Sequence, residues 1–139
     1  MLHFSYELKL NDFLRRNKGQ ALVEFAFVLP IILLVLMGII EFGRIFNTYL
    51  VLTNASREGA RVAAVGGADL DVMNSVRNVT PTLDQASLNI TINPIETSRT
   101  RGLPVTVITT YNLPLICPLV NVVLPNPFPL TSQTTMRIE

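Results

Sequence analysis

The feature that most constrains this chain is an uncharged apolar run close to its N-terminus. The run Phe25–Ile40 reads FAFVLPIILLVLMGII, and twelve of its sixteen residues are Leu, Ile, Val or Phe. Including the apolar residues from Ala21 onward, it reaches about twenty residues, enough for a helix to cross about 30 Å of hydrocarbon. The twelve large apolar side chains supply about −4 to −7 kcal/mol of insertion free energy. The sequence therefore predicts one transmembrane helix.

The charges on either side of this run predict its orientation. The basic stretch RRNK at 15–18 precedes the run, whereas Glu41 and Arg44 follow it as an i,i+3 pair. Because positive charges stay on the cytoplasmic side, residues 1–18 should lie in the cytoplasm and the C-terminal part outside it. A cleaved secretory signal peptide is the alternative. It would need a shorter apolar core and an Ala-x-Ala-like site, which the residues EFGRIFNTY after the run do not offer.

The helical pattern continues beyond the membrane. One predicted face carries Phe42, Ile45, Tyr49, Leu52, Ser56, Gly59 and Ala63, and the other carries Arg44, Asn47, Asn54, Glu58 and Arg61. This spacing of three and four predicts one helix from about Gly19 to Val65. Gly66 and Gly67 should end it, as glycines do after a helix C-terminus. Pro30 lies inside it and predicts a kink or local unwinding.

The remainder of the chain predicts a small α+β unit. A short helix is expected from Asp69 to about Asn78, with one face formed by Leu70, Met73, Val76 and Val79. Strands are expected at Leu88–Asn93, Leu103–Asn112 and Thr134–Glu139, with a hairpin turn at Ser98–Gly102. The predicted fold class is therefore α+β, with a long N-terminal helix, a short helix and a small antiparallel sheet.

The predicted organisation has three parts, namely a leader at 1–19, a membrane-spanning and extended helix at 20–65, and an outer domain at 66–139. Within the outer domain, 113–130 contains five prolines and predicts a long apolar loop. Some of its large apolar side chains should be exposed for contact with a partner or the membrane; these are Leu115, Ile116, Val122, Val123 and Phe128. The outer domain is small for a self-sufficient core, so it should pack on its own long helix or on neighbouring subunits.

Composition excludes several function classes. His3 is the only histidine, Cys117 is the only cysteine, and tryptophan is absent. We therefore predict no metal site, no cofactor and no enzymatic activity. Cys117 is interpreted as a buried small apolar residue rather than as an intermolecular disulfide partner. The net charge of +1 gives no electrostatic reason to expect nucleic-acid binding.

The segment around Gly19 carries the clearest functional motif. A basic stretch ends at Gly19, Glu24 follows five residues later, and Phe25 opens the uncharged apolar run. This arrangement resembles the processing site of type IV prepilins. The resemblance implies that a prepilin peptidase cuts between Gly19 and Gln20. The new positive amine would be costly in an apolar setting unless Glu24 of the same or a neighbouring subunit neutralised it. The alternative is that Glu24 is only a helix-start acid at the membrane interface.

A longer stretch sharpens the resemblance. The segments GQALVEFAFVLPIILLVLMGIIEFGRIF and NASREGARVAA look like the TadE-like family of minor pseudopilins from tight-adherence (Tad, or Flp) pilus systems. The residues that carry this likeness include Glu24, Phe25, Pro30, Arg57, Glu58, Gly59 and Arg61. The family implies a pilin-like fold and a bacterial cytoplasmic membrane, with the N-terminus inside. It also implies a prepilin peptidase, other pilins or pseudopilins and the pilus assembly machinery as partners.

The box at 56–61 has a simpler interpretation than a ligand site. Gly59, Ala60, Ala63 and Ala64 would allow another helix to approach closely, so we predict packing there. Two broader hypotheses compete with a structural pseudopilin. One is a single-pass, membrane-tethered binding or sensor module outside the cytoplasm, and the weaker one is an enzyme. The tethered module would keep residues 1–18, so the mature N-terminus discriminates between them.

Overall fold

The computed structural model describes residues 3–117, 120 and 124–139, with side chains from residue 19 onward. The chain divides into two compact units, Met1–Ile39 and Ile40–Glu139. The elements, in chain order, are α1 (His3–Ala64), α2 (Asp69–Asn78), β1 (Leu88–Asn93), a short 3-10 helix (Glu96–Ser98), β2 (Pro104–Leu113) and β3 (Phe128–Arg137). This arrangement confirms the predicted α+β fold with a long N-terminal helix, a short second helix and an antiparallel sheet.

Helix α1 begins much earlier than the sequence analysis predicted. It starts at His3 rather than Gly19, because residues 3–18 contain no proline and the single glycine at 19 costs a helix only about 1 kcal/mol. The helix also continues through Pro30, so of the two predicted effects of this proline, a kink or local unwinding, the unwinding is absent. The predicted C-terminus is confirmed. Gly66 has a φ of +84° and donates to the carbonyl of Ala63, while Gly67 donates to that of Val62.

The apolar part of α1 has no protein around it to bury its side chains. The segment Gly19–Ala64 contains a window with a mean hydropathy of 2.8, and none of that window is buried. Phe27, for example, is 75% exposed, and Ile31 is 63% exposed. It is the one helix, among the residues that the structure describes, that is long and apolar enough to cross a membrane. Lipid or other helices must cover these side chains.

The sheet has the simplest antiparallel topology, β1-β2-β3. In the first hairpin Leu88 pairs with Tyr111, and in the second Leu113 pairs with Phe128. The predicted strand at Leu88–Asn93 matches the structure. β2 begins and ends one residue later than predicted. Because β2 is central and rich in β-branched residues, it holds both neighbours in register.

The third strand differs from its predicted bounds. β3 runs from Phe128 to Arg137 rather than from Thr134 to Glu139, and its first residues were assigned to the apolar loop. It includes Pro129, which the sequence analysis took as evidence against a regular strand. An edge strand tolerates proline because one of its sides makes no ladder bonds, and β3 is an edge strand. The segment between β2 and β3 is therefore shorter than the predicted loop 113–130.

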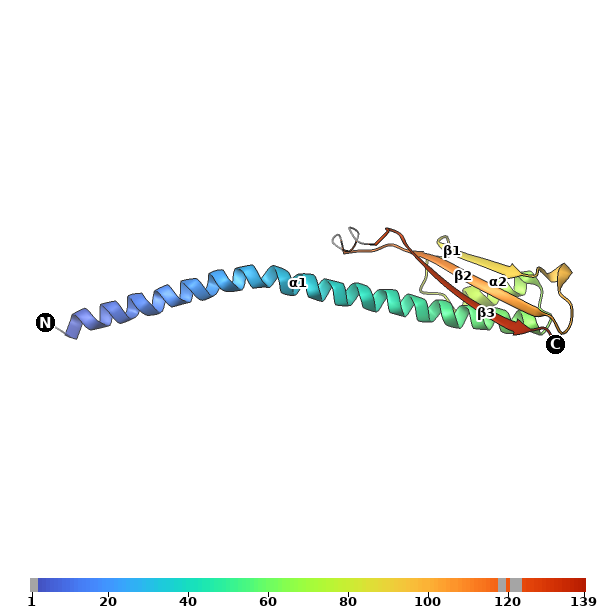
Figure 1. The fold of residues 1–139 in the computed structure, drawn as a ribbon, viewed down its shortest axis with the longest axis horizontal. Coiled ribbons are helices and arrows are strands. Elements are labelled where there is room, and N and C mark those ends of the chain that lie inside the picture. Colours follow the sequence, from blue (N-terminus) through green and yellow to red (C-terminus); the bar gives the residue numbers. More distant parts are fainter. Residues whose placement is uncertain (1–2, 118–119, 121–123) are drawn as a thin grey trace. The chain divides into compact units, whose positions relative to one another are not determined.

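The core of the Ile40–Glu139 unit lies between its two helices and one face of the sheet (Figure 1). One cluster joins small and β-branched residues of α1, α2 and the sheet, including Ala55, Ala60, Ala63, Val72, Val76, Ile92, Val105 and Val107. The second joins Leu52, Leu83, Tyr111, Leu113 and Leu130. The prediction that the outer domain packs on its own long helix is thus confirmed. Two residues of the predicted apolar face of α1, Phe42 and Tyr49, are exposed.

The predicted face of α2 is only partly turned inward, because Val76 and Met73 pack in the core whereas Leu70 and Val79 are exposed. Val72 and Val76 are fully buried, whereas Leu70 is 65% exposed. The helix has only ten residues, so the position of the two valines against α1 decides which side is buried. Thr80 is fully buried as well, and its hydroxyl donates to the carbonyl of Val76 at 3.0 Å, which closes the C-terminus of the helix.

Hydroxyl groups fasten the sheet to α1. Ser56 is fully buried, and its hydroxyl lies 2.9 Å from that of Thr134 and 3.2 Å from that of Ser132. On the neighbouring strand, the Thr109 hydroxyl donates to the carbonyl of Leu52. Because a buried hydroxyl without a partner costs free energy, these hydrogen bonds fix the position of the sheet along the helix.

Candidate functional site

The predicted processing residues lie in the Met1–Ile39 unit, on an open stretch of α1. A Cβ added to Gly19 would meet nothing within 4 Å, and Gln20 and Glu24 are exposed. The side-chain amide of Gln20 donates to Oε1 of Glu24 at 3.1 Å, one helical turn away. The Gln20 backbone nitrogen begins the same turn. Of the residues around the predicted cut, the structure therefore places Gln20 and Glu24 in contact. Phe25, the next residue, is 56% exposed.

The predicted 57–61 box lies in the other unit and divides into two faces. Gly59 faces inward, and a Cβ there would lie 2.7 Å from Cγ2 of Val76 and 3.1 Å from Cγ1 of Val107. Ala60 and Ala63 are fully buried against the same core. The packing interpretation is therefore confirmed, and the helix that approaches is α2 of the same chain.

The polar members of the box form a surface pair. Nε of Arg61 donates to Oε2 of Glu58 at 3.0 Å, and Arg57 is exposed on the same side. The hydrogen bond from Arg61 lowers the pKa of Glu58 below its usual value, and Glu58 in turn raises the pKa of Arg61. Exposed i,i+3 pairs of this kind contribute little to stability. The charged half of the box is therefore an ion pair on the surface of the helix.

Gly59 gives a stability prediction with an internal control. We expect Gly59→Ala to destabilise the Ile40–Glu139 unit by about 1 to 2 kcal/mol, because overpacking against Val76 outweighs the better helix propensity of alanine. Gly43→Ala should be neutral or slightly stabilising, since a Cβ there meets nothing within 4 Å. Thermal unfolding of the detergent-solubilised full chain measures both. Equal midpoints for the two variants would contradict the packing interpretation.

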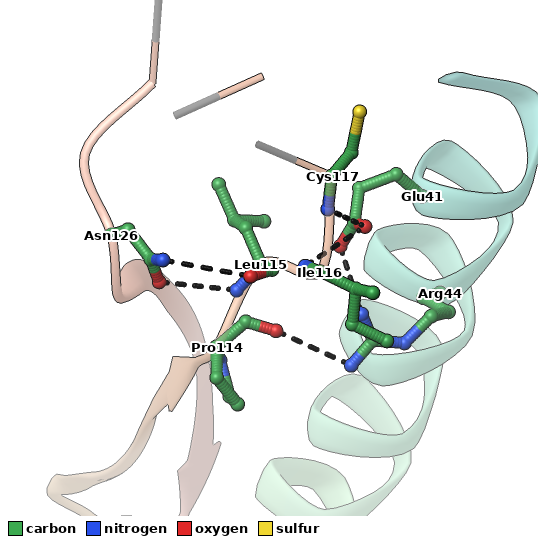
Figure 2. Close-up of polar contacts among 7 residues, drawn as sticks. All are labelled: Glu41, Arg44, Pro114, Leu115, Ile116, Cys117 and Asn126. Carbon is green, nitrogen blue, oxygen red and sulfur yellow. Dashed lines mark hydrogen bonds and ion pairs between the residues drawn. The ribbon is translucent and has the colours of Figure 1, made fainter. Parts of the chain in front are cut away.

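The most elaborate polar cluster surrounds Glu41, just after the apolar run (Figure 2). Glu41 is only 3% exposed. Its Oε1 accepts from Nη1 of Arg44 at 2.9 Å, and its Oε2 accepts from the backbone N–H groups of Ile116 and Cys117 at 3.1 and 3.2 Å. Nη2 of Arg44 also donates to the carbonyl of Pro114 at 3.3 Å. One carboxylate thus ties the segment after β2 to the helix.

In the sequence, Glu41 stands out as a neighbour of Arg44 and as part of the TadE-like segment, but neither feature predicts its contacts after β2. Its bonds to Ile116 and Cys117 span more than seventy residues, and no local spacing encodes them. The segment itself is braced from its other side, where Oδ1 of Asn126 accepts from the N–H of Leu115 at 3.1 Å. The available signal was indirect. A carboxylate directly after a membrane span needs a reason to be there, because burial of an acid without partners is costly.

The apolar side chains of the 113–130 segment have mixed environments. Ile116 is 67% exposed, Leu115 is 6% exposed, and Phe128 is half-buried at the start of β3. Val122 and Val123 lie outside the described residues. The prediction that some of these side chains would be exposed is therefore confirmed at Ile116. The prediction that Cys117 would be buried is confirmed too, with an exposure of 1%.

Comparison with known proteins supports the TadE-like resemblance of the long helix. The model of the TadE-like protein family matches residues 19–61, just under a third of the chain and entirely within α1. This confirms the resemblance that the sequence motifs indicated, and the match begins at Gly19 itself. No curated protein and no solved structure matches the chain. Together with the single exposed apolar helix, the match identifies a single-pass membrane protein.

Proposed function

We propose that this chain, whose residues 19–61 are TadE-like, is a structural minor pseudopilin that takes part in the assembly of a tight-adherence pilus. The observation that carries the proposal is the position of the family match. It begins at Gly19, where the basic leader ends, five residues ahead of Glu24 and the apolar run. The TadE-like match supports association with a Tad pilus and with other pilus components in a membrane.

In this proposal a prepilin peptidase removes residues 1–19 at the cytoplasmic face of the bacterial inner membrane. Gly19 suits such a cut for two reasons. The residue has no side chain to obstruct a peptidase cleft, and glycine weakens a helix by about 1 kcal/mol, which helps the local unwinding that cleavage requires. Cleavage leaves Gln20 with a positive amine, within one helical turn of the Glu24 carboxylate.

The outer unit supports a structural role rather than a catalytic one. Its buried polar groups, such as Ser56, Thr80 and Thr109, are engaged in bonds that hold helices and strands together. Among the described residues, no group of His, Cys, Asp and Glu side chains is arranged to hold a metal ion. A tethered binding module would share the membrane helix and the outer unit, and differs from a pseudopilin in keeping its leader.

The mature N-terminus tests the proposal. Co-expression with a prepilin peptidase should yield a chain that begins at Gln20, measured by intact mass. Gly19→Ala should slow processing by about fivefold through helix strengthening alone, and Gly19→Val should slow it further. Gly43→Ala is the matched control, because it alters another open helical glycine outside the leader and should leave processing unchanged. A chain that still begins at Met1 would contradict the proposal and favour the tethered module.

A further inference from the structure

We propose that the end of the outer unit next to the apolar run rests in the interfacial layer of the lipid bilayer. The contact is made by a membrane-proximal belt formed by Ile40, Phe42, Phe46 and Ile116. These four side chains are 64%, 63%, 58% and 67% exposed, in the same order. The inference rests on the membrane-anchoring part of the proposed function and is independent of cleavage.

The depth of the belt follows from the covalent structure. Glu41 comes one residue after the end of the apolar run, a rise of only about 1.5 Å along a helix. Ile116 is 75 residues further along the chain, yet its backbone N–H bonds to Oε2 of Glu41 at 3.1 Å. The segment after β2 is therefore held at the level where the helix leaves the hydrocarbon, and Ile116 is exposed there.

The charges at this level are already neutralised within the chain. Glu41 is almost fully buried and accepts from Arg44 and two backbone N–H groups. Nη2 of Arg44 bonds to the carbonyl of Pro114, while its long side chain can keep the charged end towards water. Little free-energy cost thus opposes immersion of this end in the interface, because no unpaired carboxylate has to enter it.

Lipid fits the belt because the belt continues an apolar surface that lipid already covers. Phe42 and Phe46 lie one turn apart, with ring centroids 5.7 Å from each other, and Phe42 comes two residues after the end of the apolar run. Aromatic rings at such a boundary commonly reside among lipid headgroups. The opposite end of the unit is different, since Asp69, Glu96 and Arg99 form a charged and hydrogen-bonded cluster there.

Tryptophan fluorescence can test this contact, because the chain has no natural tryptophan. Ile116→Trp places a probe in the belt, and Ile95→Trp is a matched control. Ile95 is 56% exposed and precedes Glu96 in the charged cluster at the opposite end. In vesicles with bromines near the headgroup ends of the acyl chains, emission from Ile116→Trp should fall by about half, as expected for side chains in the headgroup–acyl boundary. Emission from Ile95→Trp should not change.

Three further measurements keep the test decisive. Phe46→Trp probes the belt from the helix and should also be quenched, which covers the case in which Ile116→Trp does not fold. Flotation with the vesicles must come first, and a chain that does not float would overturn both this proposal and the membrane anchoring. Floating chains with both belt probes unquenched would overturn the belt alone. Quenching of the belt probes that depends on a high protein-to-lipid ratio would also overturn it, since contact with another protein would then be needed to bring the belt to the bilayer.

Discussion

Replacing Glu24 with alanine should abolish association of the processed chain with other pilins while leaving it in the membrane. The twelve large apolar residues of the run secure insertion without help from the carboxylate. What the variant loses is the nearest partner for the amine that the proposed cleavage creates at Gln20. An uncompensated charge in an apolar bundle costs about 3 to 5 kcal/mol, which is a factor of at least about a hundred in an association constant.

Co-purification and crosslinking of the processed chain with pilins of the same system measure this effect. Glu24→Gln should be nearly as poor as Glu24→Ala, because it keeps the shape and removes the charge. Glu58→Gln is the matched control, since it neutralises another carboxylate of α1 at an exposed position far from the new amine. Membrane extraction and intact mass should show all three variants inserted and processed. Wild-type association of both Glu24 variants would favour the membrane-tethered module instead.

Local sequence patterns predicted the elements whose energetics are local. The apolar run is long enough to specify a membrane helix on its own, and Gly66 ends α1 as a C-terminal glycine should. The β-branched alternation in 103–112 predicted the central strand, and the predicted helix Asp69–Asn78 matches the structure. The TadE-like resemblance could be recognised from the sequence for the same reason, because the matched residues 19–61 all lie on one helix.

The differences arise where partners distant in sequence decide the outcome. β3 extends through Pro129 because the sheet places this strand at an edge, which its own composition does not encode. α2 buries Val72 rather than Leu70, because Gly59 opens a space on α1 that valines fill. Local spacing pairs Glu41 with Arg44, and only the fold brings the N–H groups of Ile116 and Cys117 to its other oxygen.

Glu41 therefore gives the second large expected effect. Glu41→Ala leaves Arg44 without its carboxylate and two backbone N–H groups without their acceptor. We therefore expect the free energy of unfolding to fall by about 3 kcal/mol. Glu41→Gln should lose less, about 1 to 2 kcal/mol, since its carbonyl can still accept from the two N–H groups. The exposed pair gives a contrast, and Glu58→Ala should cost under about 0.5 kcal/mol.

Glu41→Ala should weaken the segment at 116–117 more than the rest of the unit. This excess separates a specific hold on that segment from a general contribution to stability. Hydrogen exchange of the Ile116 and Cys117 amides should accelerate by about a hundredfold in Glu41→Ala, the factor that corresponds to about 3 kcal/mol of local opening. Amides of β2 next to β1, such as that of Ile108, should change only as far as global stability falls. Uniform acceleration across the sheet, with no excess at Ile116 and Cys117, would show that Glu41 does not hold this segment.

Since the segment carries Ile116 to the membrane surface, Glu41→Ala should also reduce the lipid quenching of Ile116→Trp and leave that of Phe46→Trp intact.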